Sequence, residues 1–128
     1  MSYSHSQGRS DLAHARHVEA ALLDYLRGQS ARHEALVVAA VGDLRIRIDA
    51  ADALLERANT SQSTAIAFRL AAAEAARVAG HAYFELAGRS LPRPLPDAAE
   101  PALLTQRRLL GDHYLNGAAL ADGQGGQV

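Results

Sequence analysis

Residues 64–88, with the sequence TAIAFRLAAAEAARVAGHAYFELAG, constrain the fold of this chain more than any other stretch. As a helix, this stretch would be apolar around most of its circumference, which is typical of a helix at the centre of a domain. Gly88 is a natural left-handed end for such a helix. Apart from Arg69, its strongly polar residues recur every three or four positions and so share one face: Glu74, Arg77, His81 and Glu85. We expect this polar stripe to lie at an interface.

A second helix is predicted from about Glu34 to Ala58, before the central stretch. Its apolar residues follow a heptad spacing that predicts one buried face: Val37, Val41, Leu44, Ile48, Ala51, Leu55 and Ala58. Gly42 lies off this line and costs up to about 1 kcal/mol of helix propensity relative to Ala. A glycine there is consistent with a close contact to another helix.

Two more helices are predicted nearer the ends of the chain. The first runs from a cap at Ser10 or Asp11 to about Arg27. The last starts within residues 97–101 and ends near Leu120. Its apolar side consists of Leu103, Leu104, Leu110, Tyr114 and Leu115.

The connections between these helices are short and polar or proline-rich. Residues 59–63 (NTSQS) can cap the central helix, and residues 89–97 (RSLPRPLPD) predict an extended connector before the last helix. Period-two alternation is essentially absent, so no strand is expected. The predicted fold is all-α, an antiparallel four-helix bundle over residues 11–120. Residues 1–10 are expected to be disordered and residues 121–128 to form a flexible tail.

Length and composition limit the classes of function. A chain of 128 residues is expected to form one domain. Its net charge of -1 favours neither nucleic acid nor an anionic membrane as a partner. There is no Cys, and no stretch has the length and apolarity of a membrane span or signal peptide. We therefore expect a cytoplasmic protein.

Histidines are the first candidates for chemistry. His14 and His17 could meet one metal ion, but the sequence supplies no convincing further ligands, so no metal site is predicted. His81 lies four residues from both Arg77 and Glu85, and could act as a base if Glu85 oriented it beside a cavity. A polar stripe at a helix interface explains the same residues more simply.

Arg107 and Arg108 form the other candidate site. Two adjacent guanidinium groups could bind an anion such as a phosphate, although a solvated helix face explains them equally well. The sequence has no glycine-rich phosphate loop after a strand and no nucleophile elbow. The residues alone therefore predict a helical domain and no reaction.

Three segments of the chain resemble the C-terminal helical domain of the acyl-CoA dehydrogenase superfamily, in particular its flavin-dependent monooxygenase branch. ALVVAAVGDLRIRIDAADALLERA (35–58) is similar to the long helix of the family, and FRLAAAEAARVAGHAYFELAG (68–88) to its next helix. LTQRRLLGDH (104–113) is similar to a segment with a leucine, then Gln-Arg, then an Arg-Asp pair. Gln106 and Arg107 match, whereas Leu110 and Gly111 stand where the Arg-Asp pair is expected.

The resemblance implies a flavin site shared with another polypeptide. Family members have two further domains before this one, and flavin and acyl substrate lie between the middle and C-terminal domains. The chain alone is therefore expected to hold no cofactor, whereas FAD or FMN is expected only with a partner. Arg107 and Arg108 are the expected cofactor contacts. Catalytic residues stay unknown, because residues 116–120 lack the His that the monooxygenase branch often has there.

Three functions remain open at this point. The chain could be a separate C-terminal-type subunit, or a remnant, of an acyl-CoA dehydrogenase-like oxidoreductase, inactive alone and completed by a partner polypeptide. It could instead be a non-catalytic helical scaffold or interaction protein. It could also be a small biosynthetic enzyme with a new pocket in the bundle. The apolar girth of residues 64–88 further predicts a homo-oligomer, with two-fold symmetry favoured.

Overall fold

A computed structural model describes residues 5–95 and 102–120. The described regular structure is entirely helical, as predicted: α1 (Ser6–Arg27), the short 3₁₀ helix η1 (Ser30–His33), α2 (Ala35–Arg57), α3 (Gln62–Ala87) and α4 (Leu103–Asn116). None of these helices has both the length and the apolarity needed to span a membrane. The bounds of α2 and α3 agree closely with those expected from the sequence.

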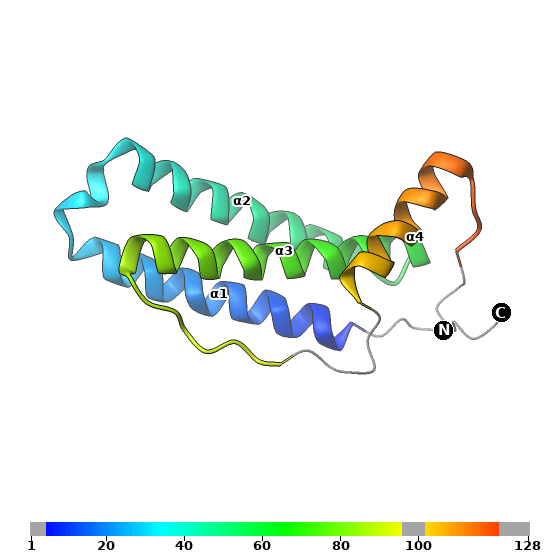
Figure 1. The fold of residues 1–128 in the computed structure, drawn as a ribbon, viewed down its shortest axis with the longest axis horizontal. Helices are drawn as coiled ribbons and strands as arrows, with labels where there is room; N and C mark the ends of the chain where they lie inside the picture. The colour runs from blue at the N-terminus through cyan, green and yellow to red at the C-terminus, as the bar shows by residue number, and fades with distance from the viewer. Residues whose placement is uncertain (1–4, 96–101, 121–128) are drawn as a thin grey trace.

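The three long helices form a bundle around α3. α3 packs along both α1 and α2, whereas α4 contacts only α3 among the described helices. In Figure 1 the colour gradient runs in opposite directions along α1 and α2, and again along α2 and α3. The connector after α3 returns along the bundle, and α4 projects from its far end. The fourth helix is therefore much less enclosed than the other three.

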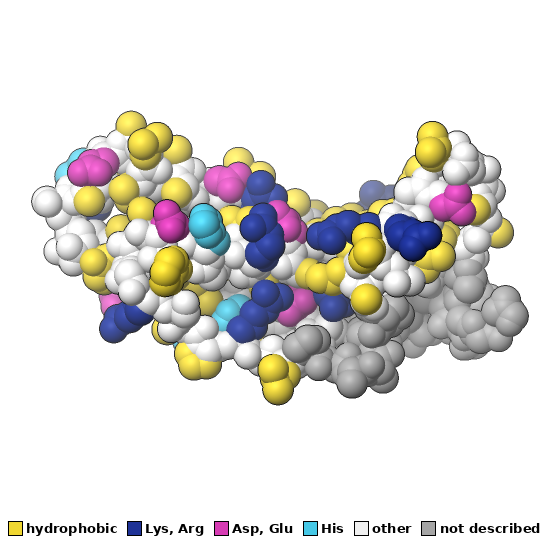
Figure 2. Space-filling view, in the orientation of Figure 1, with side chains coloured by type: hydrophobic (Ala, Val, Ile, Leu, Met, Phe, Trp, Pro, Cys, Tyr) yellow, Lys and Arg dark blue, Asp and Glu magenta, His cyan; other side chains and the backbone are white. Residues whose placement is uncertain are grey.

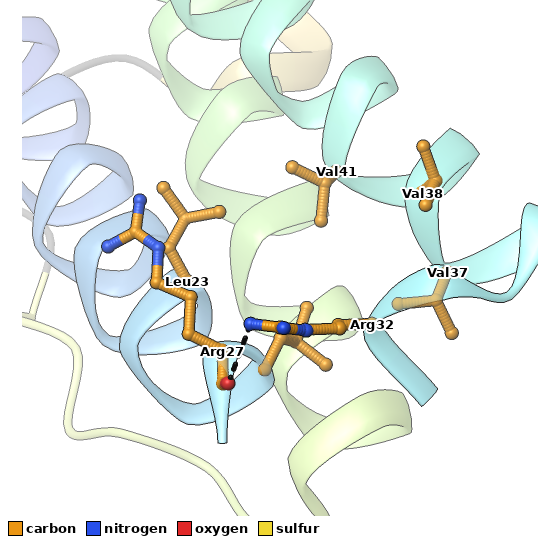
Figure 3. A pocket seen from close by; sticks show the side chains of 7 residues that line it. Leu23, Arg27, Arg32, Val37, Val38 and Val41 are labelled. Carbon is orange, nitrogen blue, oxygen red and sulfur yellow. Dashed lines mark hydrogen bonds between the residues drawn. The ribbon is translucent and has the colours of Figure 1, made fainter. Parts of the chain in front are cut away.

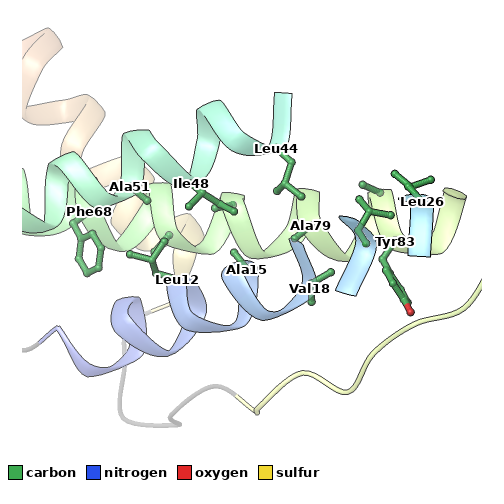
Figure 4. Close-up of a cluster of buried hydrophobic side chains, with 14 of the residues drawn as sticks. Leu12, Ala15, Val18, Leu26, Leu44, Ile48, Ala51, Phe68, Ala79 and Tyr83 are labelled. Atoms are coloured by element: carbon green, nitrogen blue, oxygen red, sulfur yellow. The ribbon is translucent and has the colours of Figure 1, made fainter. Parts of the chain in front are cut away.

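The core follows the heptad line of α2 (Figure 4). Leu44 and Ile48 are fully buried, and they pack with Phe68 of α3 and Val18 of α1 in one apolar cluster. Every residue of the predicted line is buried or half-buried. This confirms the register expected from the spacing.

The ends of α3 also match the sequence expectation. The side chain of Ser61 accepts a hydrogen bond from the backbone N–H of Thr64 at 3.2 Å and so caps the first turn. Gly88 ends the helix with φ of 80°, a left-handed conformation in which residues with a Cβ are strained. The polar break and the glycine therefore set the length of the central helix.

α1 begins at Ser6, earlier than the start expected at Ser10 or Asp11. Gln7 and Gly8 are buried, so this first turn belongs to the packed bundle rather than to a disordered segment. Residues 1–4 and 121–128, also predicted to be flexible, lie outside the described residues, as does the expected start of the last helix within residues 97–101.

Candidate functional site

The polar stripe of α3 is divided into a paired half and an exposed half. The Glu74 carboxylate accepts hydrogen bonds from Arg77 at 3.0 and 2.6 Å, and Arg47 of α2 lies 3.5 Å away. The hydrogen bonds from Arg77 lower the pKa of Glu74 below its usual 4.5, and the charges of Arg47 and Arg107 act in the same direction. This half of the stripe joins α2 to α3 and lies near α4.

His81 and Glu85 occupy the exposed half of the stripe. Both are exposed, and no hydrogen bond or ion pair joins His81 to Arg77 or Glu85 in the described part of the chain. A histidine base needs an orienting partner and a neighbouring cavity. The structure therefore does not assemble the base and orienter that the spacing allowed.

Arg107 and Arg108 lie exposed on α4. Neither forms a hydrogen bond or ion pair with another described residue, although Arg107 is close enough to Glu74 to influence the pKa of its carboxyl. In Figure 2, dark-blue arginine side chains gather where the surface is hollowed between the body of the molecule and α4. This part of the surface is therefore positively charged and open to solvent.

A hollow of about 630 Å³ lies beside Arg108. Its lining can be compared with what a flavin site needs. The described residues that line it all belong to α4: Thr105, Arg108, Leu109, Gly111, Asp112, Leu115 and Asn116. Among the described helices, only α4 lines this hollow, whereas a flavin site needs a wall for the isoalloxazine ring as well as phosphate contacts. These residues do not fit a flavin without a second polypeptide.

A buried carboxylate that the sequence analysis did not identify lies between α1, α3 and the connector. The Nη1 group of Arg69 donates to Asp11 at 3.0 Å, and Arg93 and Gln7 each donate to the same carboxylate at 3.3 Å. The side chain of Asp11 is only 6% exposed and that of Arg69 only 12%. We name Asp11, Arg69 and Arg93 the buried ion cluster. The missed signal was Arg69, a single cation in an otherwise apolar part of α3, because such a cation needs a buried partner.

The buried ion cluster borders a cavity of about 370 Å³, which is also lined by Gln7, Pro94, Leu95 and Leu103. Its carboxylate oxygens already accept hydrogen bonds from two guanidinium groups and from Gln7. The nearby His14 is also buried, and burial lowers the pKa of its imidazole, assisted by the charge of Arg93. The cluster therefore ties the connector that leads to α4 against α1 and α3.

A third cavity, of about 250 Å³, lies between the end of α1, η1 and the start of α2 (Figure 3). Its walls are apolar except for two arginines, and the Nη1 group of Arg32 donates to the backbone carbonyl of Arg27 at 3.2 Å. The lining residues are Leu23, Leu26, Arg27, Arg32, Val37, Val38 and Val41. These described residues include no carboxylate, histidine or hydroxyl group that could transfer a proton or attack a substrate.

The clearest unusual feature of the surface is the apolar side of α4. No residue of this 14-residue helix is buried. The side turned toward α3 consists of the half-buried residues Leu103, Gln106, Leu110 and His113. Four large apolar residues are exposed instead: Leu104, Leu109, Tyr114 and Leu115. The predicted apolar side of this helix is thus split, and only Leu103 and Leu110 of that set are turned inward.

Metal ligands are not gathered anywhere in the part of the chain that the structure describes, which holds no group of three or more His, Asp or Glu residues suited to a metal ion. His14 is buried whereas His17, one turn later, is exposed. Comparison with models of protein families, with curated proteins and with solved structures finds no match to this chain. The resemblance to acyl-CoA dehydrogenases therefore rests on its three sequence segments alone.

Proposed function

We propose that the chain is a helical interaction subunit that binds another polypeptide through the outer side of α4. The observation that carries this proposal is the exposure of Leu104, Tyr114 and Leu115, which are 64%, 73% and 83% exposed on a helix with no buried residue. Large apolar side chains exposed along one helix are typical of a contact site. The proposal corresponds to the scaffold or interaction protein among the three functions left open by the sequence.

The arrangement of α4 suits a helix that lies in a groove. Leu104, Arg108, Gly111 and Leu115 are spaced by four, three and four residues, so they form one line on the side away from α3. Such a line can enter an apolar groove, with Leu104 and Leu115 as anchors. The exposed Arg108 favours a partner that places a carboxylate beside this groove.

The resemblance to acyl-CoA dehydrogenases gives the proposal a more specific form. In it, the partner is a polypeptide that carries the missing flavoprotein domains, and FAD or FMN is held between the two chains. Arg107 and Arg108 are exposed on the same helix and could contact a pyrophosphate there. This form is supported only by the sequence segments and by the position of the two arginines.

Co-expression with the proteins encoded beside this chain tests the proposal. We expect one of these proteins to bind directly when both are purified, with a dissociation constant raised at least tenfold by Leu104→Gln combined with Leu115→Gln. Leu36→Gln is the matched control, because Leu36 is 86% exposed on α2, a helix that does not contact α4. Equal weakening by the control and by the α4 variant would contradict the proposal.

A visible absorption spectrum of the purified complex tests the flavoprotein form separately. A complex with bound flavin, from a chain that is colourless alone, would support it. A colourless complex that still depends on Leu104 and Leu115 would leave the interaction subunit in place and rule out the flavoprotein form.

A further inference from the structure

The side of α2 that faces away from α1 and α3 carries a line of small residues around one large apolar residue. Its members are spaced by three or four positions, and all are exposed: Ala35, Ala39, Gly42, Ile46, Ala50 and Ala53. Ile46 is 68% exposed although it lies near the middle of the helix. We name this line the outer face of α2. It does not overlap the contacts of α2 with the rest of the bundle.

Gly42 has no evident role within a single chain. A Cβ added at this position would have no atom within 4 Å, and its φ is not positive. A glycine in an exposed helix interior costs about 1 kcal/mol relative to Ala. The close approach of another helix would explain a glycine at position 42, because small residues let two helix backbones come near each other.

We propose that the outer face of α2 binds the same face of a second copy of the chain, with the two α2 helices antiparallel and Ile46 on the two-fold axis. Gly42 and Ala50 lie four residues before and after Ile46, so each faces the other across the axis. Ala39 and Ala53, seven residues before and after it, form the next pair. Every position of the line between Ala39 and Ala53 thus meets a small residue or Ile46.

The charges beside the outer face are self-complementary. Asp43 and Arg47 follow one edge, with an ion pair of 3.2 Å, whereas Arg45 and Asp49 follow the other, with an ion pair of 3.1 Å. Within the chain, Arg45 also pairs with Glu19 of α1 and Arg47 with Glu74 of α3. A two-fold axis perpendicular to the plane of the two helices brings each edge against the same edge of the second copy. Asp43 then lies about 3 Å along the axis from Arg47 of the second copy, and Arg45 lies equally near Asp49 of that copy.

Opposite charges are closer than like charges in this arrangement. For helix axes about 8 Å apart, the Cβ atoms of Asp43 and of Arg47 in the second copy are about 8 Å apart, whereas those of the two Arg47 residues are about 10 Å apart. The edges would also attract in a parallel pair. The antiparallel pair is favoured because it opposes the dipoles of the two helices.

Engineered cysteines can test this arrangement, because the natural chain has no Cys. Under mild oxidation we expect Ile46→Cys to form a disulfide-linked dimer, since residue 46 meets itself at the axis. Ala39→Cys mixed with Ala53→Cys should also link, whereas Ala39→Cys alone should not, because its two copies lie about 21 Å apart along the helix. His81→Cys, exposed on α3, measures linkage by random collision.

Sedimentation without any cross-link gives the second measurement. We expect the natural chain to be a dimer at about 100 µM, a concentration well above a micromolar dissociation constant, and Ile46→Glu to be a monomer with the same helical circular dichroism as the natural chain. A monomeric natural chain, a dimeric Ile46→Glu variant or efficient linkage of Ala39→Cys alone would overturn the proposal. The outer face of α2 is separate from α4, so this proposal and the proposed function can fail independently.

Discussion

Gly8 of α1 lies directly against the ring of Phe68 of α3. A Cβ at Gly8 would stand 2.5 Å from Cε2 of this ring, and Phe68 is only 1% exposed. The ring also meets His5 edge to face at 5.9 Å, and Nε2 of His5 lies 2.9 Å from Oδ1 of Asn59. These contacts account for the start of α1 at Ser6, because the first turn is held by α3 and by the loop before it.

The first prediction is that Gly8→Ala destabilises the protein, although alanine is the better helix former. The buried ring must shift to admit the added methyl group, which should cost about 1–3 kcal/mol. Gly80→Ala on α3 is the control, because a Cβ there meets no atom within 4 Å, and it should stabilise by about 0.5–1 kcal/mol. Chemical denaturation measures both, and a stabilising Gly8→Ala would contradict the packing described.

The second prediction concerns the centre of the core. Leu44 and Ile48 are 0% exposed, so Leu44→Ala and Ile48→Ala should each cost about 2–5 kcal/mol. Arg47 lies between them on the half-exposed side of α2, and its ion pairs at 3.2 and 3.5 Å contribute about 0–1 kcal/mol. Arg47→Ala should therefore leave the denaturation midpoint almost unchanged. Similar midpoints for all three variants would mean that the register of α2 is different.

The third prediction concerns the buried ion cluster. Asp11→Ala removes a buried carboxylate that accepts hydrogen bonds from Arg69, Arg93 and Gln7, and should cost about 3–5 kcal/mol. Arg93 is 41% exposed, so Arg93→Ala should cost only about 0–1 kcal/mol. Thermal unfolding followed by circular dichroism compares the two variants. A larger loss for Arg93→Ala than for Asp11→Ala would show that the cluster is organised differently.

The fourth prediction is a pH dependence from His14. Burial lowers the pKa of this imidazole below its usual 6.5, and the charges of Arg93 and His17 lower it further against the opposing charge of Asp11. The unfolded chain therefore binds more protons than the folded one just below pH 6.5, so stability is lost as the pH falls through the folded pKa. His14→Gln should flatten this decline in unfolding free energy. Identical pH slopes for both proteins would count against a buried neutral imidazole.

Much of the fold follows from local pattern. The heptad line of α2 and the apolar girth of α3 predict two adjacent helices with the observed bounds, because burial of a periodic face determines both. The early start of α1 has no signal in the local sequence, because Ser6–Arg9 are polar or small and this turn is held by tertiary contacts such as that of Gly8 with Phe68. Such a contact between residues 60 positions apart has no signature in local spacing.

The candidate site was less predictable than the fold. The stripe of Glu74, Arg77, His81 and Glu85 does share one face of α3, but only Glu74 and Arg77 are paired with each other. The local sequence suggests only a helix-capping role for Asp11. Its pairing with Arg69 depends on tertiary structure and has no local signal. The apolar circumference of residues 64–88 predicts that exposed apolar surface lies on that helix. In the structure, much of the exposed apolar surface lies on α2 and α4 instead. The apolar surface of α3 is covered largely by α1 and α2. The heptad pattern alone does not reveal this coverage.

Hydrogen–deuterium exchange along α4 tests the central claim most directly. In the isolated chain, α4 packs only against α3 among the described helices, so its backbone amides should exchange faster than those in the middle of α3. When the purified partner polypeptide binds, we predict that exchange within Leu103–Asn116 slows at least tenfold, while that of α2 changes much less. Exchange along α4 that stays unchanged in the complex, or is already as slow as that of α3 in the isolated chain, would contradict α4 as the binding helix.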